Sequence, residues 1–325
     1  MADTVERKIE RMRKTIRLQR PDRLPCSDWS WAEYRPEVYH LGDVDDLPPP
    51  GEVAVAADGK RKFTRDGGVW AVGDEEKYRT WEDVVATDPE QFEVEEVGSA
   101  MLDEMRRLVA QARQRGYPLP MHYGTLVTRA TIEFGWEPFL MAAALEPAAF
   151  GRLLDRFGQA SLAIIQGWAK VEEAELVVVH DDIAGTKGLL LSPQWLRQYV
   201  FPWYERLFST LRAGGKKSLY ISDGNYLEAL DDVLATGPDG LYVESSSMDP
   251  AEVMKRGGPD KLYMVKTDSR AVDFGTPDDL RQELQTLREL HHQYPGMMIY
   301  RGGGNPRPGN AEAFARLYEE LLVYE

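Results

Sequence analysis

The chain contains one cysteine, Cys26, so it can form no intrachain disulfide and cannot build a zinc site from several cysteines. Cys26 lies in the proline-flanked segment RLPCSDW, where no histidine or basic pair is close enough in sequence to activate its thiol. Histidine is also scarce, with five in 325 residues, and none forms an HExxH or similar metal-binding pair. The sequence therefore predicts no metal site of the cysteine and histidine type.

Positive charge and long apolar runs are scarce as well. The 39 Lys and Arg residues face 54 Asp and Glu residues, a formal net charge of −15, which argues against nucleic acid or an anionic membrane as a partner. No stretch approaches the roughly 20 apolar residues of a membrane span. The first residues, MADTVERKIERMRK, are charged from the start and lack the apolar core of a signal peptide. We therefore expect a cytoplasmic protein.

What the second half has instead is a repeated pattern. An apolar run ends in charged or polar residues, and a capped amphipathic helix follows; the runs cover residues 175–180, 218–221, 241–243, 262–265 and 297–300. Strands that alternate with helices predict a parallel sheet. Polar side chains placed after each strand further predict an α/β TIM (β/α)8 barrel with its active site at the carboxyl ends of the strands.

The first third of the sequence has a different pattern. Residues 5–17 form an amphipathic helix pattern, and residues 53–72 alternate as a β-hairpin around the turn Asp58-Gly59, with 69–72 as a further strand. We interpret residues 1–97 as an N-terminal extension with a small β-hairpin insertion, and residues 98–325 as the main barrel. One domain, residues 1–325, is the simplest interpretation.

Because the strands of a parallel barrel end at one mouth, the polar residues that follow them should converge there. They are His122, Asp181, Asp182, Asp223, Glu244, Lys266, Asp268 and Arg301. The adjacent Asp181 and Asp182 suit a substrate ligand, a catalytic acid or a cation site, or one caps a turn while the other is solvated. Lys266 and Asp268 suit an internal ion pair. Arg301, before three glycines, suits an anion site or an exposed position on a flexible loop.

Several segments are similar to one known family. They are GWEPFLMAAALEPAAFGRLLDRF, VVVHDDIAGTKGLLLSPQWLRQYVFPWYERLF and SLYISDGNYLEALDDVLATGPDGLYVE, with RPDRLP near the start. On these the chain resembles the uroporphyrinogen decarboxylase superfamily, which includes cobalamin-dependent and O-demethylase methyltransferases. The resemblance implies a TIM barrel, a small-molecule substrate and a homodimer. Asp66-Gly67-Gly68-Val69-Trp70 looks like a region near the substrate pocket of the methyltransferase branch.

The departures from that family limit the chemistry. Where the zinc methyltransferases carry His-x-Cys-Gly, this chain has Ile221-Ser222-Asp223-Gly224, and no cysteine follows within 302–305. The zinc site of the family is therefore not expected, and we expect no permanently bound cofactor. Oxygen ligation of Mg²⁺ or Ca²⁺ by Asp182, Asp223 and Glu244 stays an alternative. The opening of the true decarboxylases is replaced by SWAEYRPEVY, which lacks their propionate anchors.

The leading hypothesis is methyl transfer from a small methoxy- or N-methyl substrate to a corrinoid carried by a separate protein. The expected catalytic acids are Asp66, Asp182, Asp223 and Glu244. The expected substrate-binding residues are Trp70, His122, Arg129, Asp181, Tyr220, Lys266, Asp268 and Arg301. One alternative is a decarboxylase of uroporphyrinogen or another carboxylate substrate, with Arg129, Arg301 and Lys266 binding the acid. The other is a binding protein without catalytic activity.

Overall fold

The computed structural model describes residues 4–27, 38–41, 53–55, 61–64, 69–71, 73–74, 77–301 and 307–324. Of the predicted site residues, Asp66 lies outside these ranges. Trp70 lies in a strand whose backbone alone is described. None of the helices in the described ranges combines the length and apolar character that a bilayer span requires.

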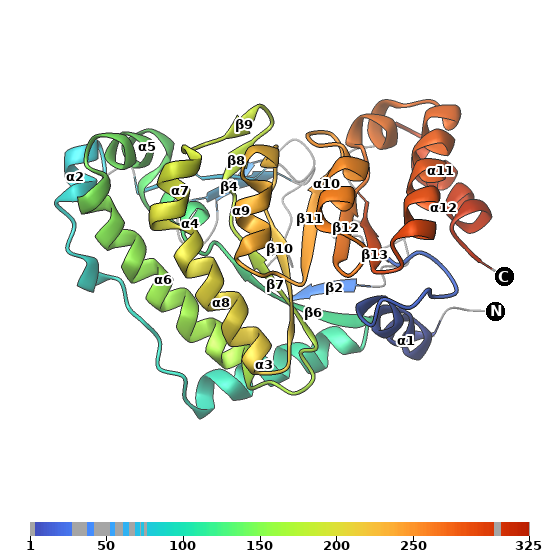
Figure 1. The fold of residues 1–325 in the computed structure, drawn as a ribbon, viewed down its shortest axis with the longest axis horizontal. Helices are drawn as coiled ribbons and strands as arrows, with labels where there is room; N and C mark the ends of the chain where they lie inside the picture. Colours follow the sequence, from blue (N-terminus) through green and yellow to red (C-terminus); the bar gives the residue numbers. More distant parts are fainter. Residues whose placement is uncertain are drawn as a thin grey trace.

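Eight strands form one sheet in which every neighbouring pair is parallel (Figure 1). In spatial order they are β1 (Cys26–Ser27), β13 (Met297–Tyr300), β12 (Leu262–Lys266), β11 (Gly240–Glu244), β10 (Lys217–Ile221), β7 (Leu176–His180), β6 (Tyr117–Tyr123) and β2 (Val38–Leu41). The five predicted runs are β7 and β10 to β13, so the predicted parallel sheet is confirmed. The end strands β1 and β2 contact each other, without a ladder between them in the described residues. Complete closure of the barrel stays a prediction.

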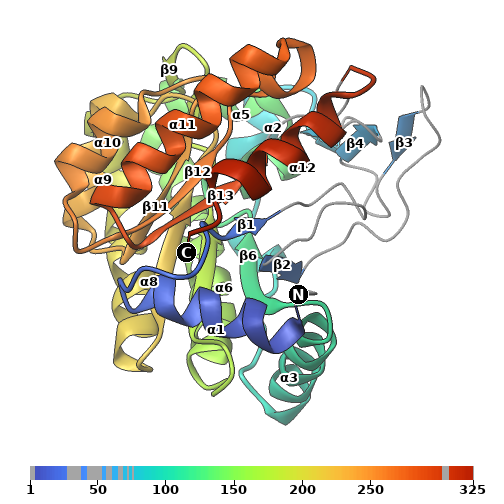
Figure 2. The same ribbon diagram turned by 90° about the vertical axis from the view of Figure 1, so that its right-hand side faces the viewer.

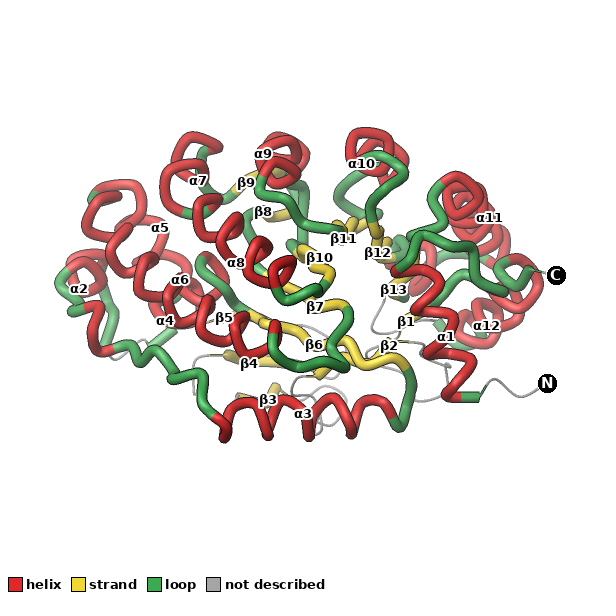
Figure 3. The backbone as a smooth tube through the Cα atoms, turned by 60° about the horizontal axis from the view of Figure 1, so that its bottom comes forward, coloured by secondary structure: helices red, strands yellow, loops and turns green. Residues whose placement is uncertain are grey.

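Helices surround the outside of the curled sheet, as Figure 3 shows. They are α2 (Trp81–Val85), α3 (Ser99–Arg113), α4 (Val127–Phe134), α5 (Trp136–Leu145), α6 (Pro147–Ala169), α7 (Pro193–Tyr199), α8 (Phe201–Ala213), α9 (Leu230–Ala235), α10 (Pro250–Gly257), α11 (Pro277–Gln293) and α12 (Asn310–Leu321). Outward strand residues such as Val177 and Val179 pack against this layer in the larger of two apolar clusters. The architecture is therefore α/β with the helices outside, as in a TIM barrel.

The inside of the sheet holds the second apolar cluster. Alternate strand residues face inward, among them Leu119 of β6, Val178 of β7 and Met264 of β12. The helix α1 (Val5–Ile16) adds Ile9, Met12 and Ile16 to the same cluster. Because Tyr117, Leu176 and Leu262 at the strand starts belong to it too, α1 closes the amino-terminal end of the sheet (Figure 2). The opposite, carboxyl-terminal end is left for a site.

Two smaller sheets lie beside the main one. The strands β3 (Val53–Val55), β4 (Arg61–Thr64) and β5 (Val69–Ala71) pair antiparallel. The short hairpin of β8 (Ala184–Gly185) and β9 (Gly188–Leu189) follows β7. It stands at the carboxyl-terminal end of the strands in Figure 1.

Gly158 lies where α6 packs closely against Trp203 of α8. A Cβ atom there would overlap the indole ring of Trp203, and the hydrogen bond from Trp203 Nε1 to Asp155 (2.9 Å) holds that ring in place. We predict that Gly158→Ala lowers the free energy of unfolding by about 1–3 kcal/mol through overpacking, despite the roughly 1 kcal/mol by which alanine favours a helix. Urea denaturation measures the loss. Gly185→Ala is the matched control, since its Cβ would meet nothing within 4 Å, and an equal loss in both variants would contradict the packing argument.

Candidate active site

The alternation of side chains along the strands decides which residues face the mouth of the sheet. In β7, Leu176 and Val178 face the interior, and His180 continues that row at the carboxyl end. The ring of His180 stacks on Tyr123 of β6, with ring centroids 4.2 Å apart. In β11 and β12 the same row ends in Glu244 and Lys266, which are paired in the register of the two strands. The mouth is thus formed by side chains from neighbouring strands.

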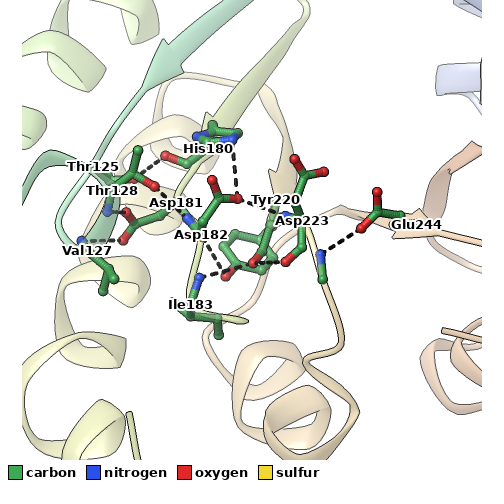
Figure 4. A network of polar contacts seen from close by, with 12 residues as sticks. Thr125, Val127, Thr128, His180, Asp181, Asp182, Ile183, Tyr220, Asp223 and Glu244 are labelled. Carbon is green, nitrogen blue, oxygen red and sulfur yellow. Dashed lines mark hydrogen bonds and ion pairs between the residues drawn. The ribbon is translucent and has the colours of Figure 1, made fainter. Parts of the chain in front are cut away.

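Asp182 is the first carboxylate of this mouth (Figure 4). Its Oδ1 lies 3.4 Å from His180 Nε2 and accepts a hydrogen bond of 2.8 Å from the backbone N–H of Asp223. The backbone N–H of Asp182 donates to the Thr128 hydroxyl at 2.7 Å, which fixes the turn after β7. Burial raises the pKa of Asp182, His180 lowers it, and the carboxylates of Asp223 and Glu244 raise it, for a net increase. Asp182 is therefore able to keep a proton where an exposed aspartate would have lost it.

Glu244 and Lys266 form the second charged pair of the mouth. Lys266 Nζ donates to Glu244 Oε1 at 2.6 Å, and Glu244 Oε2 accepts from the Gly224 N–H at 2.9 Å and the Ser247 hydroxyl at 3.0 Å. Gly224 has φ +80°, and a Cβ there would meet the Gly185 carbonyl group at 2.6 Å, so only glycine fits. Burial raises the pKa of Glu244, but Lys266 and the donated hydrogen bonds hold it below its ordinary value.

Asp223 joins the two pairs. Its N–H bonds to Asp182, the next N–H along the chain bonds to Glu244, and its own carboxylate is exposed beside them (Figure 4). The three carboxylates of Asp182, Asp223 and Glu244 together raise the pKa of Lys266 against the effect of its burial. Burial and the charges of Asp223 and Glu244 likewise raise the pKa of the inward-facing Tyr242. The structure thus brings together four of the predicted residues: Asp182, Asp223, Glu244 and Lys266.

Asp181 faces the other way, into the helix layer. Its carboxylate is fully buried and accepts from the backbone N–H groups of Leu126, Val127 and Thr128, at 3.2, 3.1 and 2.8 Å, and from the Tyr204 hydroxyl at 2.8 Å. These N–H groups belong to the first turn of α4, which has no other acceptor for them. Asp181 therefore anchors α4 to the end of β7, and we assign it a structural role.

The remaining predicted residues also lie away from the mouth. Tyr220 is buried between Tyr204 and Tyr226 and donates to the Asp181 carbonyl at 3.2 Å. Burial and the charges of Arg129 and His180 lower the pKa of His122 to about 3, so it is neutral. The guanidinium of Arg129 lies 4.7 Å from the ring centroid of Phe157, and that of Arg301 lies 5.5 Å from that of Phe314. Both arginines point into the helix layer.

The prediction that Lys266 forms an ion pair with Asp268 is wrong. Lys266 pairs with Glu244, whereas Asp268 pairs with Arg270 at 2.8 Å, and its N–H donates to Glu283 of α11. Lys266 closes the inward row of β12, while Asp268 lies beyond the strand, in the loop that runs outward to α11. Asp268 instead lines a pocket of about 380 Å³ with residues 245–250, Glu283, Leu287 and Leu290, outside the mouth.

With this geometry in view, the comparisons with known proteins decide the family. The family model of uroporphyrinogen decarboxylase (URO-D) matches residues 75–303, well over half of the chain. The chain belongs to this family. The matched range includes every mouth residue named above, so the family's fold provides the framework for the site.

One solved structure supports the fold. A methyltransferase from Methanosarcina mazei is 14% identical, with a TM-score of 0.63 over 96% of this chain and 98% of that one. A glycosylated endo-β-1,4-xylanase of glycoside hydrolase family 10 from Gloeophyllum trabeum is 9% identical, covers 66% of this chain and 79% of that one, and has a TM-score of 0.41, too low to carry an argument. No curated protein matches the chain.

This family member does not carry the donors of a zinc site at the matching position. Ile221, where the zinc methyltransferases have histidine, is buried in the apolar interior, and Asp223 stands in place of the cysteine. Within the described ranges, no cluster of three or more His, Cys, Asp or Glu side chains is arranged to hold a metal ion. The residues that are present fit proton transfer and charge recognition better than thiolate ligation of zinc.

Sequence reasoning missed His180 and Tyr242 as mouth residues. His180 ends β7, which is apolar on both faces, so the alternation of its side chains is invisible in LVVVH. The alternation of side chains along a strand was the signal that could have found it: if Val178 points inward, so do His180 and Asp182. Tyr242 follows from the same rule, two residues before Glu244.

The Glu244–Lys266 pair predicts a pH-dependent stability. The two side chains are only 14% and 20% exposed, so we expect Glu244→Gln to lower the free energy of unfolding at pH 7 by about 1–3 kcal/mol, the worth of a hydrogen bond to a charged group. Because the folded pKa of Glu244 is depressed, the contribution is complete above its unfolded pKa of about 4.3 and disappears as the pH falls through the folded value. Urea denaturation between neutral and acidic pH measures it. Ser247→Ala, which keeps the ion pair, should retain the pH dependence, and a loss in Glu244→Gln that does not vary with pH would contradict the assignment.

Proposed function

We propose that this URO-D family member transfers a methyl group from a small methoxy- or N-methyl compound to a corrinoid carried by a separate protein. The observation that supports this most is the pair of Asp182 and His180 at the mouth of the sheet, where burial and neighbouring carboxylates favour a protonated acid. Transfer of methyl from oxygen leaves the bonding electrons on that oxygen, which then needs a proton. In this proposal Asp182 supplies that proton.

Each residue of the mouth has a part in this proposal. The corrinoid, as the second substrate, supplies the two-electron nucleophile that takes the methyl group. Asp182 gives its proton to the departing oxygen as the bond to the methyl carbon breaks, and His180 holds the carboxyl in place. The ion pair of Glu244 and Lys266 fixes the loop 222–224 through the Gly224 N–H, and so fixes Asp223 beside Asp182. From the resemblance to the uroporphyrinogen decarboxylase superfamily, we also propose that the protein forms a homodimer.

The decarboxylase alternative needs cations to hold several carboxylates. Of its three expected cations, Arg129 and Arg301 pack over the rings of Phe157 and Phe314, and Lys266 is paired with Glu244. The described part of the mouth is therefore poor in free positive charge, which favours methyl transfer over binding of a polycarboxylate.

Two assays on the purified chain separate the alternatives. The first mixes it with free cob(I)alamin and a panel of methoxyaromatic and N-methyl compounds, and follows methylcobalamin by its visible spectrum. The second supplies uroporphyrinogen and looks for coproporphyrinogen by fluorescence after oxidation. Methylcobalamin formed only with enzyme supports the proposal. Coproporphyrinogen overturns it in favour of the decarboxylase, and inactivity in both, including with corrinoid proteins added, favours a binding protein.

A further inference from the structure

The mouth carries more negative charge than its own cations balance. In the described ranges it holds three carboxyl groups, of Asp182, Asp223 and Glu244, against one ammonium, Lys266, and the imidazole of His180. With Asp182 protonated, as the proposed function requires, and Glu244 paired with Lys266, the negative charge of Asp223 remains. Asp182, Asp223 and Glu244 all raise the pKa of Lys266, and Asp223 and Glu244 also raise the pKa of Asp182. The three side chains therefore share one electrostatic environment. Like charges held this close favour a bound counter-cation.

Lys266 offsets only part of this negative charge. Its Nζ lies 2.6 Å from Glu244 Oε1, and the pair neutralises itself in a largely buried position. Asp182 lies against His180, whereas Asp223 is an exposed residue whose carboxylate also acts on Lys266 and Tyr242 (Figure 4). A substrate carboxylate here would meet the negative charge of Asp223, which is unfavourable.

The side of the mouth formed by β6 and β7 is aromatic. Tyr123 is 40% exposed and stacks on His180 with one face, so part of its ring remains accessible to a ligand. His180 is 4% exposed, and its Nδ1 has no hydrogen-bond partner in the part of the chain that the structure describes. This buried ring nitrogen without a partner, on the histidine that contacts Asp182 through its other nitrogen, leaves a polar position for a ligand to satisfy. An exposed aromatic face beside carboxylates also suits a cation.

We infer that the substrate of this mouth carries a positively charged ammonium group together with its methyl donor, and that Asp223 and the face of Tyr123 bind the ammonium. The inference rests on the proposed function, because it names the substrate class of the same site. It assigns different tasks to two neighbouring acids: Asp182 gives the proton, and Asp223 recognises charge. On this inference the charged group of the substrate is a cation bound by Asp223, rather than a carboxylate bound by Lys266 or Arg301.

Three probes of matched size test the charge preference. They are 2-(4-methoxyphenyl)ethylamine, which is cationic at pH 7, the neutral 2-(4-methoxyphenyl)ethanol and the anionic 3-(4-methoxyphenyl)propionate. Calorimetric titration of the full chain measures the affinity of each without any corrinoid. We expect the amine to bind at least about tenfold more tightly than the alcohol, and the carboxylate to bind most weakly, as expected for one ion pair in a partly solvated site. In Asp223→Asn the preference for the amine should fall severalfold, whereas Asp231→Asn, at an exposed carboxylate on α9, should keep it.

The outcomes separate this inference from the proposed function. An amine that binds no better than the alcohol, or does not bind, overturns the inference, and so does an Asp223→Asn variant with an unchanged preference. Methyl transfer to cob(I)alamin from the alcohol or the carboxylate in that case leaves the proposed function standing. Tight binding of the amine with no methyl transfer from any compound supports the inference and counts against the proposed function.

Discussion

Replacing Asp182 with asparagine should lower kcat/KM for methyl transfer by about 100-fold or more, the usual contribution of a general acid. Asparagine keeps the shape of the side chain and still has an oxygen to accept the Asp223 N–H, so the turn should survive. What it loses is the proton for the departing oxygen. The rate of methylcobalamin formation at limiting substrate measures the effect.

The pH dependence gives the same prediction an independent test. Because the acid must be protonated, activity should fall as the pH rises through the pKa of Asp182, which burial and the nearby carboxylates place above its ordinary value. Asp182→Asn should lose this limb of the profile. Asp231→Asn, the same change at an exposed position, should keep both rate and profile. An Asp182→Asn variant within about threefold of the parent rate would remove Asp182 from the mechanism.

Substitution of Asp181, the residue before Asp182, should affect the stability of the protein. We expect Asp181→Asn to lower the free energy of unfolding by about 3 kcal/mol, because one amide oxygen cannot accept from four buried donors, and each buried donor left unpaired costs about 1–3 kcal/mol. Burial raises the pKa of Asp181 while the donated hydrogen bonds lower it, so the site is built around an acceptor. The midpoint of urea denaturation measures the loss.

Tyr204→Phe supplies a graded control for that experiment. It removes one of the four donors and leaves the three backbone N–H groups bonded, so about 1 kcal/mol is expected. Asp182→Asn should cost less than about 1 kcal/mol, since its carboxylate lies at the mouth. If Asp181→Asn were as stable as Asp182→Asn, the anchoring role of Asp181 would be refuted.

The sequence was sufficient to predict β7 and β10 to β13 and their common direction, but not β1 and β2 of the same sheet. Apolar runs followed by charged residues at β7, β10, β11 and β12 are local signals, and the parallel sheet follows from the helices between them. Asp182, Asp223, Glu244 and Lys266 were predicted because each follows or ends such a run. Because the strands are parallel, the residues at their carboxyl ends were expected to lie at one end of the sheet.

The face of the sheet toward which each side chain points was harder to predict. In LVVVHDD every strand position suits a buried strand, so the pattern does not say whether Asp181 or Asp182 faces the mouth. Tyr220 lies one residue from the inward Ile221 and was expected to line the pocket, yet it faces the helix layer. Arg129 and Arg301 depend on contacts with Phe157 and Phe314, which are distant in sequence and invisible to local patterns.

The position of α1 has a consequence for how the chain is made. Its apolar face packs against residues as late as Met298, β1 pairs with β13, and the Leu24 N–H donates to the Leu322 carbonyl. On a ribosome, this helix is therefore complete long before the strands that it covers exist. We expect α1 to dock after nearly the whole chain has emerged, as a late event in folding. Until then its row of Ile9, Met12 and Ile16 stays uncovered, a surface that a chaperone can bind during synthesis.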